Sequence, residues 1–324
     1  MLRFGICTRD QYDRAAKRRD SLVPAISYKL LEVDEEATGE EIEMFEYIHF
    51  WLRTSNGTFR TTFRNRFRDV DVALMQLLRK TYGTDAHICV QDRAASHALT
   101  SSEWAEQLFK IFPYTEFEAS DLVTYLFQVW LPSGETYIVE PDGEPLQWIS
   151  PPFVVNLCQT EPLRYPLNRV LAARARKRFE RLRVASRVAK SCGGRDIGVT
   201  SIACVHPMAR LLAKRNSRFR VNRRSVFEHT PGVDVLRTMN ILNRSYFSER
   251  KLRDGITAAF NSLNPGGIWI VGRTFEHNFS NHVTFFRKHE SGWEVLLRIG
   301  GGWEAEDLTF RMASQDGKYQ EAVV

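Results

Sequence analysis

The stretch from Asp234 to Thr274, DVLRTMNILNRSYFSERKLRDGITAAFNSLNPGGIWIVGRT, decides the fold class that this sequence predicts. It begins with an apolar run that predicts a buried strand, and Asn240 and Asn243 follow in a loop. An amphipathic helix, a Pro-Gly-Gly turn and a second β-rich run complete the stretch. This order is typical of a parallel α/β sheet, in which ligands bind at the carboxyl ends of the strands.

The flanking segments continue the alternation of strands and helices. β-rich runs at 87–92 and 115–122 enclose a helical segment, and two more β-rich runs at the end of the chain are joined by a Ser-Gly turn. We therefore expect an open, mainly parallel α/β sheet with an antiparallel edge.

Two regions are expected along the chain. Residues 1–84 carry apolar residues mostly at helical spacing and predict an N-terminal helical region, and residues 85–324 predict the α/β domain. Turn signals between short β-rich runs, followed by a basic helical segment, predict an insertion at about 128–200 that holds a β-hairpin and a basic helix.

Composition excludes several classes of protein. The chain has 324 residues, 43% hydrophobic and 12% aromatic, as expected of a packed globular protein. It has neither an apolar run of transmembrane length nor the apolar core of a signal peptide, and its five cysteines are scattered. We therefore expect a cytoplasmic location, free thiols and no membrane span. The eight histidines lack metal-ligand spacing, so no metal is assigned.

Basic residues are concentrated in one segment of a chain whose net charge is +6. Between Arg169 and Lys190 there are nine Lys or Arg and one acid, Glu180. This segment is either a solvated helix face or a surface for an acidic partner. It lacks the interleaved aromatics that stack nucleic-acid bases. The basic patch comprises Arg174, Arg176, Lys177, Arg178, Arg181 and Arg183.

These elements, in this order, resemble a class I S-adenosylmethionine (SAM) methyltransferase. That family has a Rossmann-like, doubly wound and mainly parallel seven-stranded sheet that ends in an antiparallel hairpin. The likeness is closest to the CheR-type glutamate methyltransferases of chemotaxis receptors, whose fourth-strand region reads like fDvIfcRNvliYF, then a helix, then L.pGG.l..G. This chain has VDVLRTMNILNRSYF at 233–247 and LNPGGIWIVGRT at 263–274. The likeness covers about residues 85–310 and is best over 219–274.

The resemblance implies SAM as the cofactor and assigns each part of the site. Asp121 matches the acid that binds the ribose hydroxyls, Ser225 and Val226 stand where the family contacts the adenine, and Asn243 lies in the loop near the transferred methyl group. The implied catalytic residues are Asn240 and Asn243. The implied cofactor-binding residues are Asp92, Ala94, Ser96, Glu103, Asp121, Ser225, Val226, Asn240 and Ile241.

The chain departs from the family pattern in three ways. The first loop, QDRAASHALTSSEW, contains no glycine, and alanine lacks the positive-φ freedom of glycine. Ser225 replaces the acid that is common on the adenine side. A long segment also separates Asp121 from the next core strand, which permits a second threading. In that threading the run at 199–206 is the second strand, and His206 stands at the ribose position.

Other interpretations of single residues stay open. Asp92 and Asp121 could instead cap helices, and the two asparagines could satisfy backbone groups of a turn.

Three functions are compatible with these residues. The first is a CheR-like SAM-dependent methyltransferase with an unidentified acceptor, which the basic patch would face if the acceptor is an anion. The second is a methyltransferase fold without catalysis that acts as a binding module through its basic insertion. The third is a nucleic-acid-binding protein in which the same patch makes the main contact.

Overall fold

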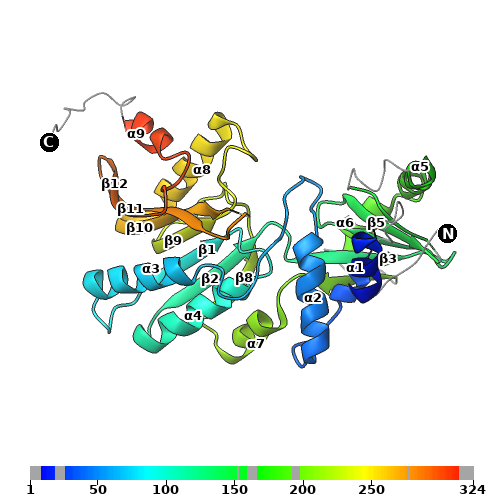
Figure 1. The fold of residues 1–324 in the computed structure, drawn as a ribbon, viewed down its shortest axis with the longest axis horizontal. Coiled ribbons are helices and arrows are strands. Elements are labelled where there is room, and N and C mark those ends of the chain that lie inside the picture. The colour runs from blue at the N-terminus through cyan, green and yellow to red at the C-terminus, as the bar shows by residue number, and fades with distance from the viewer. Residues whose placement is uncertain are drawn as a thin grey trace. The chain divides into compact units, whose positions relative to one another are not determined.

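The computed structural model describes residues 9–18, 26–151, 153–158, 166–191, 198–275 and 277–313 (Figure 1). It divides the chain into two compact units. Unit 1 comprises residues 1–62 and 123–207, and unit 2 comprises residues 63–122 and 208–324. No helix in the described part of the chain is long and apolar enough to span a membrane.

Unit 2 is built on a seven-stranded sheet whose order is β12-β11-β10-β9-β1-β2-β8. The five strands from β8 to β10 are parallel, β11 is antiparallel to β10, and β12 is antiparallel to β11. The antiparallel pair therefore forms one edge of an otherwise parallel sheet. The strands are β1 (Cys89–Arg93), β2 (Glu116–Asp121), β8 (Phe219–Arg223), β9 (Val233–Met239), β10 (Leu263–Thr274), β11 (Asn281–His289) and β12 (Gly292–Ile299).

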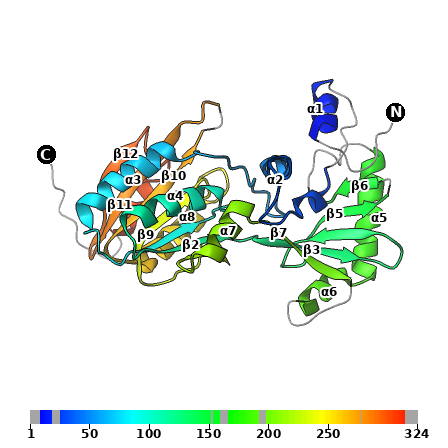
Figure 2. The ribbon, with the colours of Figure 1, turned by 90° about the horizontal axis from the view of Figure 1, so that it is seen from below.

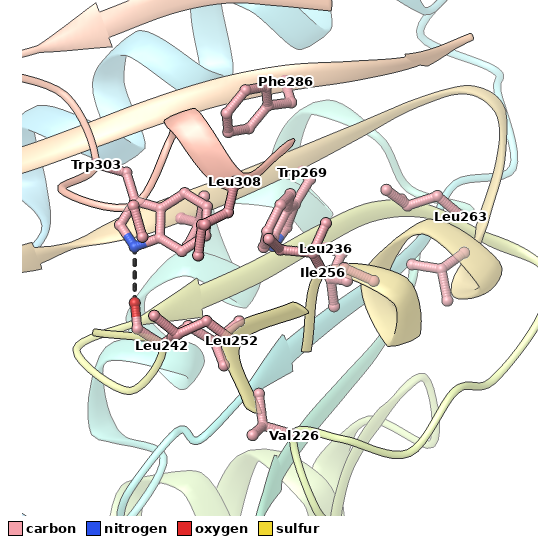
Figure 3. Close-up of a cluster of buried hydrophobic side chains, with 14 residues drawn as sticks. Val226, Leu236, Leu242, Leu252, Ile256, Leu263, Trp269, Phe286, Trp303 and Leu308 are labelled. Carbon is pink, nitrogen blue, oxygen red and sulfur yellow. Dashed lines mark hydrogen bonds between the residues drawn. The ribbon is translucent and has the colours of Figure 1, made fainter. Parts of the chain in front are cut away.

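Helices cover both faces of this sheet (Figures 1 and 2). In β9, Leu236 packs with Ile256 of α8 in one buried apolar cluster (Figure 3). The next residue, Arg237, contacts α3 and α4. Because successive side chains of a strand point to opposite faces, β9 is buried on both sides. The helices are α3 (Arg68–Thr81), α4 (Leu99–Ile111), α8 (Glu249–Ser262) and α9 (Asp307–Ala313), and α7 (Pro207–Arg215) precedes β8.

Unit 1 has its own antiparallel sheet, with the order β6-β5-β4-β3-β7. Leu126 of β3 joins the apolar cluster of η1 and α2, and its neighbour Phe127 joins that of α5 and α6, so each face of the sheet is covered by helices. The strands are β3 (Tyr125–Trp130), β4 (Thr136–Val139), β5 (Pro145–Ser150), β6 (Phe153–Asn156) and β7 (Val199–Ala203). The helices are α1 (Arg9–Lys17), η1 (Tyr28–Leu31), α2 (Gly39–Trp51), α5 (Pro166–Arg181) and α6 (Val184–Ser191).

The units divide the chain differently from the two regions expected of the sequence. The apolar residues Phe45 and Ile48 of α2 pack with Ile138 of β4, so the first 62 residues belong with the inserted segment. Helix α3 belongs to unit 2, so residue 84 is not a boundary between units. The inserted segment runs from 123 to 207 and forms a complete sheet rather than the hairpin expected at about 128–200.

The second threading of the sequence is wrong. Its proposed second strand is β7, which pairs antiparallel with β3 in the sheet of unit 1. The strand that lies beside β1 is β2, and it ends in Asp121. His206 is buried in unit 1, where its Nε2 lies 3.1 Å from Oε1 of Glu46. It therefore does not occupy the ribose position.

Candidate functional site

The order of the strands in unit 2 fixes where a ligand site is expected. From β1 the chain continues to β2 and β8 on one side, and β9 lies on the other side of β1, beside β10. Such a reversal is a topological switch point, and ligands of open α/β sheets bind beyond the carboxyl ends of the strands there. Arg93 of β1 is the register partner of Thr238 of β9, so the loops after these two strands start side by side.

The loop after β1 adopts backbone angles that glycine favours, although it contains no glycine. Three alternate residues adopt positive φ, namely Ala94 (58°), Ser96 (56°) and Ala98 (63°). For L-residues this conformation costs about 1–2 kcal/mol each, and such strain is concentrated at functional sites. This loop therefore takes a strained path that its alanine and serine residues do not favour locally.

Asp121 holds this loop in place. It is the last residue of β2, it is half-buried, and its Oδ2 accepts the backbone N–H of Ser96 at 2.8 Å. The neighbouring N–H of Ala95 donates to the carbonyl of Ser120 at 2.9 Å. Two consecutive amides of the loop are thus fixed by the end of β2.

Neither Asp92 nor Asp121 caps a helix, so that interpretation of the sequence is wrong. The N-cap of α4 is Ala98, and the chain continues from Asp121 into β3. Asp92 lies within β1, and its carboxylate is bound to the fully buried Arg237 of β9. Arg237 donates from Nε to Oδ1 at 2.9 Å and from Nη2 to Oδ2 at 2.6 Å.

A second carboxylate completes this buried group. Arg237 also donates from Nη1 to Oδ1 of Asp71 at 2.8 Å, and Ser101 donates its hydroxyl to Oδ2 of Asp92 at 2.6 Å. Burial raises the pKa of Asp71 to about 7, although Arg237 opposes this. Burial acts to lower the pKa of Arg237, but Asp92 and Asp71 outweigh it and raise that pKa. We call Asp71, Arg237 and Asp92 the buried trio.

Asn240 joins the loop after β9 to the end of β10. Its φ is +61°, its N–H donates to the carbonyl of Gly272 at 2.8 Å, and its Oδ1 accepts the N–H of Thr274 at 2.6 Å. The hydroxyl of Thr274 donates in turn to Oδ1 of Asn281 at 2.8 Å. The side chain of Asn240 therefore shapes the carboxyl edge at the switch point.

Asn243 shapes the rest of this loop. Its Oδ1 accepts the backbone N–H groups of Ser245 and Tyr246 at 3.0 and 3.1 Å, which is the turn role that asparagine favours. Ile241 is half-buried and packs against the apolar cluster beside α8. In the same cluster the indole N–H of Trp303 donates to the carbonyl of Leu242 at 2.7 Å (Figure 3).

The other expected cofactor-binding residues lie in neighbouring segments. Oε2 of Glu103 in α4 accepts the N–H of Asn65 at 3.0 Å. The hydroxyl of Ser225, in the loop after β8, accepts the N–H of Phe227 at 3.3 Å. Val226 is buried in the apolar cluster beside α8 (Figure 3).

The sequence patterns did not predict a role for Arg237 or Asp71 near the candidate site. The available signal was an arginine in the middle of the apolar strand VDVLRTM, because a fully buried charge requires a partner. Within the described residues no group of three or more His, Cys, Asp or Glu is placed to hold a metal ion, and Cys89, Cys158 and Cys204 are free thiols. The remaining two cysteines, Cys7 and Cys192, lie outside the described residues.

The parallel strands with a switch point between β1 and β9, covered by helices on both faces, define the fold. It is a Rossmann-like fold. No protein-family model matches the chain, and no curated protein matches it.

Solved methyltransferase structures are similar to the chain. The CurJ carbon methyltransferase is 10% identical, and the match covers 65% of this chain and 35% of CurJ with a TM-score of 0.32. The SAM-dependent methyltransferase SibL in its apo form is 14% identical, with 84% of this chain and 45% of SibL covered and a TM-score of 0.31. A protein-L-isoaspartate O-methyltransferase is 10% identical, with 73% of this chain and 48% of that protein covered and a TM-score of 0.29. The chain spans less than half of the length of each of these three proteins. The fold assignment rests on the strand order and not on these likenesses.

Proposed function

We propose that unit 2 binds SAM at the carboxyl edge between β1 and β9, and that the protein is a SAM-dependent methyltransferase. One observation carries the proposal: the loop at 94–98 adopts positive φ at alternate residues and is tied to Asp121 by the N–H of Ser96. Strain of this kind is retained where function requires it. Here it shapes the loop that would lie against the cofactor.

The roles of the residues follow from their places in unit 2. The carboxylate of Asp121 accepts hydrogen bonds from the ribose hydroxyls, and the segment at Ser225 and Val226 contacts the adenine. Asn240 and Ile241 border the methyl group, and Asn243 fixes their loop. Asp92 acts through Arg237, because its carboxylate is already bound within the sheet. Methyl transfer from a sulfonium is an in-line displacement that needs positioning more than acid–base chemistry.

The CheR-like motif at 233–274 supports a CheR-like subtype, and the basic α5 supports an anionic acceptor or partner. Arg176 donates to the carbonyl of Leu157, and Arg178 donates to Oε2 of Glu135. The other basic-patch residues are exposed and form no ion pair within the described parts of the chain: Arg174, Lys177, Arg181 and Arg183. These are the cations that would contact an anionic partner.

Calorimetric titration with SAM and with S-adenosylhomocysteine tests the proposal. We expect micromolar binding to the wild-type protein, and a loss of at least tenfold in affinity for the Asp121→Ala variant, because a charged acceptor for two hydroxyls is removed. Asp121→Asn keeps an oxygen that can accept the N–H of Ser96 and separates support of the loop from ligand contact. Asp254→Ala, an exposed carboxylate of α8, is the matched control.

A result without binding would favour the second function. If neither ligand binds at millimolar concentration, we would infer that the side chains of Ala94, Ser96 and Ala98 prevent the close approach of a cofactor to the backbone of this loop. The protein would then act as a non-catalytic module, and effort should move to partners of α5.

A further inference from the structure

When Asp71 and Asp92 are both ionised, the buried trio carries more negative than positive charge. Arg237 is fully buried and Asp71 and Asp92 are 6% and 3% exposed, so one guanidinium serves two carboxylates away from solvent. Arginine keeps its proton in proteins, so the trio has a net charge of about −1 when both carboxylates are ionised. The other charged groups that act on Asp71, Glu103 of α4 and Asp69 of its own helix, are also acidic.

The aromatic surroundings of Arg237 limit the screening of this charge by solvent. Its guanidinium carbon lies 4.3 Å from the ring centre of Trp104 and 5.1 Å from that of Phe67. The two rings and the strands around it exclude water, and a charge in such surroundings acts over a longer range than one at the surface.

Asp92 and Arg237 of the trio lie just before the carboxyl ends of β1 and β9, next to the switch point. Asp92 and Arg237 are register partners in β1 and β9, Ala94 follows Asp92 by two residues, and Asn240 follows Arg237 by three. At about 3.3 Å per residue, both loops of the candidate site begin within about 10 Å of the trio. A cation bound between these loops would be attracted by the excess negative charge.

We propose that the buried trio makes the site of unit 2 selective for a cationic sulfonium ligand over its neutral thioether product, with Asp71 as the specificity-determining residue. This inference rests on the proposed function. SAM carries a positive sulfur that S-adenosylhomocysteine lacks, so the negative charge that the trio carries when Asp71 is ionised attracts the cofactor more than the product. Across about 10 Å at an effective dielectric constant of about 20, one charge changes an equilibrium constant roughly tenfold.

The test compares the ratio of the two affinities in two proteins at two pH values. Asp71→Asn has the same shape as the wild-type residue and keeps an oxygen for Arg237 but removes the excess charge. At pH 8 we expect the preference for SAM over S-adenosylhomocysteine to fall roughly tenfold in this variant, with the affinity for S-adenosylhomocysteine unchanged. Asp254→Asn on α8 is the control for loss of a surface carboxylate and should keep the wild-type ratio.

A change of pH gives the same comparison without a substitution. Protonation of Asp71 neutralises the trio, so the preference of the wild-type protein for SAM should fall between pH 8 and pH 5.5. The ligands themselves also titrate over this range, but equally for both proteins. A smaller change of the affinity ratio in Asp71→Asn than in the wild-type protein therefore gives the part due to Asp71. An unchanged ratio in both comparisons, with both ligands bound, would overturn this inference and leave the proposed function standing. If neither ligand bound, both would be overturned.

Discussion

The backbone N–H of Ser96 donates to Oδ2 of Asp121 at 2.8 Å and so joins the loop after β1 to the end of β2. The donor belongs to a residue with positive φ, and the acceptor is the acid that resembles the ribose acid of methyltransferases. One hydrogen bond thus links the strained loop to the side chain that would bind the cofactor. A substitution in this loop tests directly whether its backbone is strained.

Ala94→Gly should stabilise unit 2. Glycine adopts positive φ without the clash of a Cβ atom, and this gain exceeds the added entropy of the unfolded chain, so we expect about 0.5–1 kcal/mol of added stability. Ala73→Gly, at a half-buried position within α3, is the matched control and should destabilise by about 1 kcal/mol. Urea denaturation measures both, and a destabilised Ala94→Gly protein would show that the loop is not strained.

Arg237→Ala should destabilise unit 2 by about 3–5 kcal/mol, because it leaves the buried carboxylates of Asp71 and Asp92 without their cation. Arg244→Ala is the control. Arg244 binds Glu249 and Asp307, but its side chain is 40% exposed, so its loss should cost less than about 1 kcal/mol. Equal losses of unfolding free energy in the two variants would contradict the assigned role of the trio.

Asp71 should give unit 2 a stability that falls as pH rises. Burial raises its pKa to about 7 in the folded protein, whereas an aspartate in an unfolded chain has a pKa near 4. Between these values the folded state holds a proton that the unfolded state has lost. Its contribution is therefore complete below about pH 4, and it is lost as pH rises through 7, by at most about 1.4 kcal/mol per pH unit.

The Asp71→Asn variant isolates this contribution. Its unfolding free energy, relative to the wild-type protein, should rise from pH 5 to pH 8 in urea denaturation. A constant difference over this range would mean that Asp71 does not titrate there.

Charge reversal of Arg174, Lys177 and Arg181 should weaken any binding of the protein to an anionic partner, because these exposed cations lie along α5. Anisotropy with a labelled DNA duplex at several salt concentrations tests the nucleic-acid function. For that function we expect affinity to fall steeply with salt in the wild-type protein and less steeply in the variant. Arg250→Glu, at an exposed position of α8, controls for reversal of a surface charge away from α5. A flat salt profile of the wild-type protein would exclude nucleic acid as the partner.

The strands of unit 2 could be predicted because a buried strand requires a run of apolar, β-rich residues, which is visible in the local sequence. The runs at 87–92 and 115–122 became β1 and β2, and the quoted stretch became β9, α8 and β10. Which sheet a strand joins is not a local property. The run at 199–206 has a similar pattern, yet it pairs with β3 in unit 1, because hydrogen-bond partners and not composition decide the sheet.

The conformation of the first loop could not be predicted from its residues. Alanine and serine ordinarily avoid positive φ, so the sequence QDRAASHA indicated a departure from a glycine loop. The packed ends of β1 and β2 impose the conformation on Ala94, Ser96 and Ala98 through the hydrogen bonds of Ala95 and Ser96. Tertiary contacts outweighed the local preference.

The sequence by itself determined the α/β class, the position of Asp121 after a core strand and the basic character of α5, because each depends on neighbouring residues. Only the tertiary structure decided that Asp92 binds Arg237 and that Asp71 joins them. Asp71 and Arg237 are 166 positions apart, and the parallel register of β1 and β9 with α3 packed on their face brings them together. A buried charge selects its partner by distance in the folded chain, which no local pattern encodes.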